Sequence, residues 1–353
     1  MMEQVRLNID GNDIVAASSR TILEAAKEAG VRIPSLCYEQ RMEPYGACRI
    51  CLVEVEGARG LLPACCTAVT DGMVVHTDTD QLRRIRRTII ELILSDHPLD
   101  CMTCESAGHC ELQDLAYEYG VKDPRFSGEQ HSFEVLRDNP LIERDYNKCI
   151  LCGRCIRICR EVQGVGVYDF VNRGFDAVPG TPYDKPMMET PCEFCGQCVS
   201  TCPTGALTSI PSQGKGRTWQ VEKVRTTCPY CGCGCQLDLH VRDGEIVEVS
   251  SPVMVGPGQG NLCVKGRYGY AFVNHEDRLT TPLIKRGGEF VQATWEEALG
   301  VVTDRILKAL DDEGPDSVAF LSSARSTNEE NYLLMKLARA VVGTNNIDHC
   351  ARL

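Results

Sequence analysis

The alternation of apolar and polar residues predicts a small mixed fold at the start of the chain. The pattern indicates a hairpin, then a helix, then two further strands, over residues 5–12, 21–29, 50–56 and 73–77. Ser19 is the expected N-cap of the helix, and Gly30 is expected to follow its last turn. These elements predict a first domain over residues 1–79.

A longer helix is expected next, with Asp80 as its N-cap. Its apolar positions recur at helical spacing and are Leu82, Ile85, Ile89, Leu92 and Ile93. Its opposite face carries four arginines, which we expect to be solvated: Arg83, Arg84, Arg86 and Arg87. The helix is expected to end at residues 95–96, within a module over 80–120, and a polar connector is predicted at 121–140.

The last third of the chain predicts strands and helices of another domain. Two strands are expected at 236–242 and 245–249, joined by an Asp243–Gly244 turn. Further on, we expect a helix from Thr294 to about Asp311, and then a buried strand, a helix and a strand at 317–323, 328–342 and 345–348. One βα repeat of this kind is too small to bury its own apolar faces.

Composition and charge narrow the class of protein. The chain has 353 residues, which predicts several domains, and its hydrophobic content of 43% suits globular folding. Its net charge of −12 argues against a nucleic-acid partner. No apolar run is long enough for a membrane span, and no secretory signal opens the sequence, so we expect a cytoplasmic protein.

The 22 cysteines, in a chain without a secretory signal, indicate metal ligands rather than disulfides. A repeated motif places four cysteines at spacings of two, two and three residues. The first copy is Cys149, Cys152, Cys155 and Cys159, and the second is Cys192, Cys195, Cys198 and Cys202. This is the bacterial ferredoxin spacing, in which the fourth cysteine of each run binds the other [4Fe–4S] cluster. A crossed assignment follows: Cys149, Cys152, Cys155 and Cys202 hold one cluster, and Cys192, Cys195, Cys198 and Cys159 hold the second. Zinc is the alternative, but it prefers two separated cysteine pairs. We therefore predict a double [4Fe–4S] domain over 141–211.

Four cysteines in the first domain predict a [2Fe–2S] cluster. These are Cys37, Cys48, Cys51 and Cys65, on a scaffold that resembles the β-grasp of plant-type ferredoxins. Cys66 competes for the fourth position. We choose Cys65 because related modules carry an Ala-Cys-x-Thr sequence there.

A third kind of cluster is predicted after the long helix. His97 precedes Cys101, Cys104 and Cys110 at a spacing that resembles a [4Fe–4S] site with one histidine and three cysteines. A neutral imidazole in place of a thiolate changes the cluster's charge and hence its potential. His109 is the competing ligand, and the spacing favours His97.

The last motif consists of Cys228, Cys231, Cys235 and Cys263, which predict one more [4Fe–4S] cluster. Only Cys66, Cys233 and Cys350 then remain without a predicted role. The chain is thus expected to hold one [2Fe–2S] and four [4Fe–4S] clusters.

The chain from Cys228 onward resembles the N-terminal part of molybdenum- or tungsten-dependent formate dehydrogenases. The resemblance is carried by residues 263–267, 278–283, 295–299 and 345–352. The preceding modules resemble the N-terminal extension of the soluble, NAD-linked formate dehydrogenase catalytic subunit. Iron-only hydrogenases share that extension, and the large peripheral subunit of respiratory complex I shares part of it.

The resemblance implies an α+β multidomain protein that ends in the start of a molybdopterin oxidoreductase domain. Its [4Fe–4S] domain would span 217–275, and an incomplete α/β domain would span 276–353. Formate oxidation to CO2, or the reverse, would occur at a molybdenum or tungsten bis-pterin guanine dinucleotide in the full-length subunit. Lys265 would assist electron passage. The alternative is an iron–sulfur electron-transfer subunit without its own catalysis.

The same resemblance bears on partners and on the end of the chain. No dinucleotide fingerprint is present, and the glycines at 256–260 are not between a strand and a helix. An NAD(P)- or ferredoxin-linked partner subunit is therefore expected to accept the electrons. Residues 349–353 resemble the run that precedes the metal-bound cysteine or selenocysteine. We therefore hypothesise that a UGA codon for selenocysteine follows, deliberate truncation being the alternative.

Overall fold

The computed structural model describes residues 3–349, which form two compact units. Unit 1 contains the chain up to Lys223 together with His240–Ser250 and Leu262–Tyr268. Unit 2 contains Val224–Leu239, Ser251–Asn261 and the chain from Gly269 onward. Within residues 3–349, no helix has the length and apolar character needed to cross a bilayer.

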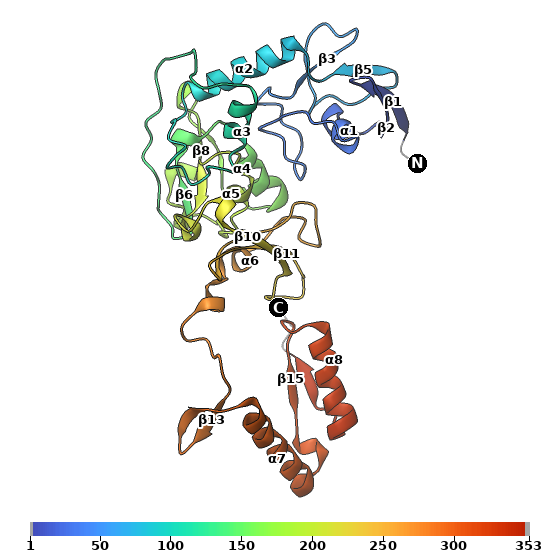
Figure 1. Cartoon of the computed structure of the whole chain (residues 1–353), viewed down its shortest axis with the longest axis vertical. Coiled ribbons are helices and arrows are strands. Elements are labelled where there is room, and N and C mark those ends of the chain that lie inside the picture. Colours follow the sequence, from blue (N-terminus) through green and yellow to red (C-terminus); the bar gives the residue numbers. More distant parts are fainter. Residues whose placement is uncertain (1–2, 350–353) are drawn as a thin grey trace. The chain divides into compact units, whose positions relative to one another are not determined.

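Unit 1 begins with a five-stranded mixed sheet in the order β2-β1-β5-β3-β4, with α1 beside it (Figure 1). The elements are β1 (Gln4–Ile9), β2 (Asn12–Ala17), α1 (Ile22–Glu28), β3 (Leu52–Val55), β4 (Leu62–Pro63) and β5 (Met73–His76). β1 pairs with β2 in an antiparallel hairpin and with β5 in parallel. The predicted hairpin, helix and two strands are therefore confirmed.

The N-cap of α1 is Thr21, so the prediction of Ser19 is wrong. The Thr21 hydroxyl accepts a hydrogen bond from the Glu24 amide, and the Glu24 carboxylate accepts one from the Thr21 amide at 2.9 Å. This reciprocal capping box satisfies two amides at once, which a cap at Ser19 could not do. Gly30 follows the helix with φ +77°, as expected for a residue that ends a helix.

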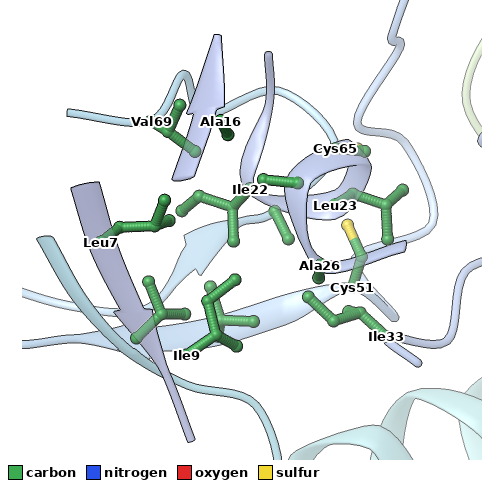
Figure 2. Close-up of a cluster of buried hydrophobic side chains, with 14 of the residues drawn as sticks. Leu7, Ile9, Ala16, Ile22, Leu23, Ala26, Ile33, Cys51, Cys65 and Val69 are labelled. Carbon is green, nitrogen blue, oxygen red and sulfur yellow. The ribbon is translucent and has the colours of Figure 1, made fainter. Parts of the chain in front are cut away.

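One face of α1 packs on the sheet to form the first core. Figure 2 shows Ile22 between the strand side chains Leu7 and Ile9 and the rest of α1, with Cys51 and Cys65 in the same cluster. Ile22 and Ile9 are fully buried. Two of the predicted [2Fe–2S] ligands are therefore part of the hydrophobic core, which fixes their positions.

We expect Ile22→Ala to destabilise this core by about 2–5 kcal/mol, because it removes buried methyl groups and leaves a cavity. The measurement is hydrogen exchange of the β1 and α1 amides, which should become faster. Val15→Ala is the matched control, since Val15 is 59% exposed and its truncation should change exchange little. Equal exchange rates in the two variants would contradict this prediction.

Two helices follow, α2 (Asp80–Leu94) and α3 (Glu111–Glu118). Thr79, not the predicted Asp80, is the N-cap of α2, because its side chain accepts a hydrogen bond from the Leu82 amide. The end of α2 at Ser95 is as predicted.

The expected faces of α2 need two corrections. Arg86 is not solvated but 1% exposed, and it donates to the backbone carbonyls of Ile50 and Leu52 at 3.1 and 2.8 Å. Leu92 is not in the apolar contact but 51% exposed, whereas Ile90 is fully buried. The buried face of α2 therefore includes a charged residue, Arg86, whose hydrogen-bond partners are carbonyls of a segment distant in sequence.

The polar segment that follows leads into short elements around the repeated cysteine motif. They are β6 (Ile142–Arg144), α4 (Arg154–Arg157), a π-helix (Ile158–Val162), β7 (Asp169–Val171), β8 (Val178–Gly180), α5 (Gln197–Thr201) and β9 (Leu207–Ser209). β6 pairs with β9 and β7 pairs with β8, both antiparallel. A separate core joins Ile142, Ile156 and Leu207 to several of the cysteines.

Residues 222–250 form a three-stranded sheet in the order β10-β11-β12. Its strands are β10 (Glu222–Thr227), β11 (Gln236–Arg242) and β12 (Glu245–Ser250), and α6 (Val264–Tyr268) follows. The two predicted strands are confirmed. Asp243 and Gly244 both have positive φ, 52° and 82°, as the predicted two-residue turn requires.

The remaining strands, α-helices and π-helix of unit 2 are β13 (Leu283–Arg286), β14 (Glu289–Gln292), α7 (Trp295–Glu313), β15 (Phe320–Ser322), α8 (Asn328–Lys336), a π-helix (Leu337–Val342) and β16 (Ile347–His349). Thr294 caps α7 as predicted. β15 pairs in parallel with β16, as a βα repeat should. It is shorter than expected, and it is not buried as predicted, because the other elements of the described chain cover it only in part. No residue of α7 is buried, and Leu321 is 86% exposed, so this segment leaves its apolar faces uncovered.

Candidate iron–sulfur sites

The four predicted [2Fe–2S] ligands converge at the edge of the first core. Side-chain hydrogen bonds join Cys37 to Cys48 and Cys65, and Cys65 also to Cys51. The Cys48 amide points at the Cys37 sulfur at 3.5 Å, and the Leu36 amide points at the Cys48 sulfur at 3.4 Å. Amides directed at sulfur stabilise a thiolate or a cluster's negative charge. The sulfur–sulfur hydrogen bonds with Cys48 and Cys65 lower the pKa of Cys37.

The neighbouring Cys66 occupies a different environment. Cys65 is fully buried, whereas Cys66 is exposed, and their sulfur atoms are 3.5 Å apart. A Cβ on Gly46 would lie only 2.9 Å from the Cys66 sulfur, so the loop approaches this pair closely. The geometry places Cys65, as chosen from the sequence, with the other three thiols.

The two copies of the repeated motif share the backbone turn around their second cysteine, although Cys159 lies in a π-helix and Cys202 in extended backbone. Leu151 and Phe194 have φ of 53° and 52°, and each donates its amide to the first sulfur of its own copy at 3.4 Å. Gly153 and Gly196 then have φ of 68° and 71° at the start of α4 and α5. Left-handed residues turn successive amides toward the inside of each loop, which is the arrangement that anionic clusters require.

The crossed pairing predicted for these cysteines is matched by two separate cavities. One cavity is lined by Cys149, Cys152, Cys155 and Cys202. The other is lined by Cys159, Cys192, Cys195 and Cys198. In each cavity, three sulfurs come from one copy of the motif and the fourth comes from the other copy.

The chemistry of the donors fits clusters in these cavities. Burial raises the pKa of the Cys149 and Cys152 thiols to about 12 each. Thiols of that kind stay protonated and unreactive unless iron supplies the positive charge that stabilises the thiolate. Among residues 3–349, no three His, Cys, Asp or Glu side chains surround a position for a single metal ion.

The predicted histidine ligand has a free nitrogen in a buried position. His97 Nδ1 is shielded from solvent and has no hydrogen-bond partner. Burial lowers the pKa of His97, which favours the neutral imidazole that metal ligation needs. His109, the competing candidate, is exposed.

Part of the same module, from Cys104 to Glu111, lies against the end of the ferredoxin repeat. Cys110 is buried, and Cys104 packs so closely on Gly205 that a Cβ there would be 2.8 Å from its sulfur. The Glu111 amide donates to the Pro203 carbonyl at 3.0 Å. The module and the loop after Cys202 therefore form one packed region of unit 1.

Next to this module, His131 holds the connector in place. Its ring stacks on Phe133 and Phe175, with centroids 4.9 and 3.8 Å away. Nδ1 faces the Asp96 carboxylate and Nε2 faces the Phe175 carbonyl at 2.5 Å. Both nitrogens face acceptors, so both must carry a proton. Burial lowers the pKa of His131, but the Asp96 carboxylate and the Phe175 carbonyl outweigh it and raise the net pKa above 6.5.

A pH dependence with a definite sign follows from the raised pKa of His131. Its contribution to local stability is complete below the unfolded pKa and is lost as pH rises through the native pKa. Amides near residue 131 should therefore exchange faster, after correction for intrinsic rates, as pH rises above about 6.5 and through the raised pKa of His131. His131→Gln should remove this dependence. An unchanged pH profile in that variant would show that another group is responsible.

The last predicted cysteine set is divided between the two units. Cys228, Cys231 and Cys235 belong to unit 2, and Cys263 belongs to unit 1. Within unit 2, the Cys228 amide donates to the Cys235 carbonyl at 2.8 Å, closing the loop. The set of four stays a prediction. The predicted Lys265 lies on α6 and is exposed, and Cys350 lies outside the described residues.

The sequence does not predict one contact of this loop, which is made by Gly258. Gly258 lies beside Cys235, and a Cβ there would be 3.2 Å from its sulfur and 2.9 Å from the Asn261 carbonyl oxygen. The glycine run at 256–260, rejected as a dinucleotide site, therefore packs on the cysteine loop. A glycine between a cysteine motif and its distant fourth cysteine is the signal that could have indicated this contact.

Comparison with protein families assigns domains to these segments. A 2Fe–2S iron–sulfur cluster binding domain matches residues 2–80, and the NADH-ubiquinone oxidoreductase-G iron–sulfur binding region matches 86–125. The ferredoxin-like domain of NADH-quinone oxidoreductase subunit 3 matches 139–208. The molybdopterin oxidoreductase Fe4S4 domain matches 221–275, and the molybdopterin oxidoreductase family matches 278–353.

Curated relatives align with nearly the whole chain. The NADPH-Fe(3+) oxidoreductase subunit alpha of Geobacter sulfurreducens is 42% identical over 99% of this chain and 40% of its own length. An NADH-quinone oxidoreductase subunit of Rhizobium meliloti is 39% identical, again over 99% of this chain and 40% of its own length. A putative formate dehydrogenase of Staphylococcus aureus is 30% identical over 100% of this chain and 39% of its own length. The chain thus spans about two fifths of the length of these relatives.

A solved structure is similar as well. The NAD+-reducing [NiFe]-hydrogenase in the H2-reduced state contains a chain that is 29% identical, with a TM-score of 0.56, over 61% of this chain and 89% of that one. The predicted formate dehydrogenase identity is thus supported only in its coarser form, since nearer relatives carry other names. The chain is thus similar, segment by segment, to [2Fe–2S] and [4Fe–4S] binding domains that are followed by molybdopterin oxidoreductase domains.

Proposed function

We propose that this chain conducts electrons through one [2Fe–2S] and four [4Fe–4S] clusters, between a molybdopterin-type active site and a partner subunit. The observation that carries the proposal is the pair of cavities, each lined by four cysteines in the crossed arrangement. The bound clusters supply the one-electron chemistry, and the protein fixes their positions and surroundings.

The ligands proposed are those predicted from the sequence. Contacts within unit 1 support a path between the ligand sets that this unit contains. Arg267 of α6 donates to the Cys195 carbonyl at 2.9 Å, which joins the segment of Cys263 to the second copy of the repeat. Gly205 packs against Cys104, which joins the end of the repeat to the His97 module.

A reductive titration tests this function directly. The anaerobically purified chain should take up about five electrons, one for each cluster, when dithionite is added stoichiometrically. EPR signals of both cluster types should appear as the electrons enter. Uptake of one or two electrons, or a sample without iron EPR signals, would rule out a five-cluster electron path.

The reaction that supplies the electrons is the finer part of the proposal. The similarity to molybdopterin oxidoreductases supports a molybdenum or tungsten bis-pterin guanine dinucleotide in the complete subunit, with formate and CO2 as one candidate substrate pair. Lys265 would then assist electron passage. The similarity to subunits with NADPH and NADH in their names supports an NAD(P)-linked partner instead of, or together with, formate chemistry.

Dye reduction by the natural full-length protein with its partner subunits separates these candidates. Formate-dependent reduction would support a formate dehydrogenase. Reduction with NADPH or NADH alone would favour an electron-transfer subunit without its own formate chemistry, which is the second candidate.

A further inference from the structure

Two arginines of α4 are buried among the predicted ligands of the first cubane, which is the [4Fe–4S] cluster assigned to Cys149, Cys152, Cys155 and Cys202. Arg154 and Arg157 are 6% and 4% exposed, and they flank Cys155 in the short helix that follows Cys152. A buried guanidinium is costly unless its donors are satisfied. Their hydrogen-bond partners come from three separate segments of unit 1.

Arg154 binds one carboxylate and two backbone carbonyls. Its Nη1 and Nη2 atoms donate hydrogen bonds to the two oxygens of the Glu111 carboxylate at 2.5 and 2.9 Å. Nη2 also donates to the Tyr38 carbonyl at 2.8 Å, and Nη1 donates to the Thr201 carbonyl at 3.3 Å. This forked geometry is specific to arginine.

Each of these partners is next in sequence to a predicted cluster ligand. Tyr38 follows Cys37 of the [2Fe–2S] set, Glu111 follows Cys110 of the His97 module, and Thr201 precedes Cys202 of the first cubane. Arg154 therefore contacts three residues, each of which is adjacent in sequence to a ligand of a different predicted cluster.

Arg157 makes a second connection to the [2Fe–2S] loop. It donates to the Cys37 carbonyl at 2.5 Å and to the Glu43 carbonyl at 2.7 Å, and it lies over the Tyr45 ring at 5.1 Å. The first cubane loop and the [2Fe–2S] loop are thus held together by two arginines of one helical turn.

We propose that Arg154 is a positioning residue that fixes the first cubane against the [2Fe–2S] and His97 sites, and that its charge raises the first cubane's reduction potential. The inference rests on the proposed cluster function. One-electron reduction adds one negative charge to the cubane without forming or breaking a covalent bond. The buried guanidinium of Arg154 stabilises that added charge. The Glu111 carboxylate, whose side chain is 44% exposed, cancels the positive charge of Arg154 only in part.

The test is an EPR-monitored redox titration of the full chain with its clusters bound, using dithionite as the electron donor. Arg154→Gln should shift the reduction equilibrium of one cubane signal at least tenfold toward the oxidised form, which for one electron is 59 mV more negative. Loss of that signal in Cys152→Ala identifies it as the first cubane. Glu111→Gln should shift the same signal in the opposite direction, which a merely structural role would not produce.

Two further variants separate charge from geometry. Arg154→Lys keeps the positive charge but not the forked guanidinium. The reduction potential of the first cubane should therefore stay near that of the unmodified chain, while its magnetic coupling to the neighbouring clusters changes. Arg160→Gln removes an exposed arginine of the same segment and should leave the signal unshifted.

An unshifted signal in both Arg154→Gln and Glu111→Gln, with full iron content, would overturn the inference while leaving the cluster function intact. If Arg154→Gln loses the cubane instead, the inference is tested by Glu111→Gln alone: a shift of the signal toward the reduced form supports it, and an unshifted signal overturns it. Absence of clusters in the unmodified chain would overturn the proposed function itself.

Discussion

In a chain whose Cys152 and Cys155 are replaced by alanine, the further change Cys202→Ser is expected to leave iron content unchanged. In the same background, Cys159→Ser should remove about four more irons. The first pair of changes eliminates the cubane whose cavity Cys202 lines, so nothing remains for Cys202 to hold. Cys159 lines the other cavity, with Cys192, Cys195 and Cys198. The measurement is iron per chain after anaerobic purification.

The control for this prediction is Cys66→Ser in the same background. Cys66 is exposed and is not among the predicted ligands, so the iron content should stay at the level of the background. If Cys202→Ser removed four irons and Cys159→Ser removed none, each copy of the motif would hold its own cluster. The crossed arrangement would then be wrong.

His97→Cys is expected to keep its cluster but to lower the reduction potential by on the order of 100 mV. A thiolate in place of a neutral imidazole adds one negative charge to the site, which disfavours a further electron. The unpartnered, buried Nδ1 of His97 makes this residue the expected ligand. His97→Ala should lose the cluster, with about four fewer irons per chain.

The matched control for His97 is His109→Ala. His109 is exposed, so its removal should change neither iron content nor potential. The measurement is a potentiometric titration followed by EPR. If His109→Ala lost the cluster and His97→Ala did not, the assignment of the histidine ligand would be reversed.

The sequence could predict what depends on local spacing. The ferredoxin repeat is a local motif, because short loops around a cubane fix how far apart the cysteines can be. The same holds for the Asp243–Gly244 turn and for the Thr294 cap, which depend on neighbouring residues only. Both were predicted, and both are present.

The sequence could not predict what depends on distant backbone. Arg86 looked like a solvated charge, yet its partners are carbonyls of Ile50 and Leu52. Arg154 and Gly258 likewise have roles that only their tertiary neighbours reveal. The choice between Ser19 and Thr21 failed for a smaller reason, because either can cap a helix and only Thr21 has Glu24 three residues later.

Combined iron and labile sulfide analysis of the anaerobically purified chain tests the central claim most directly. Four cubanes and one binuclear cluster correspond to about eighteen irons and as many sulfides per chain. A coloured protein with that content is the expected result. A colourless protein that contains zinc and no labile sulfide would contradict the account.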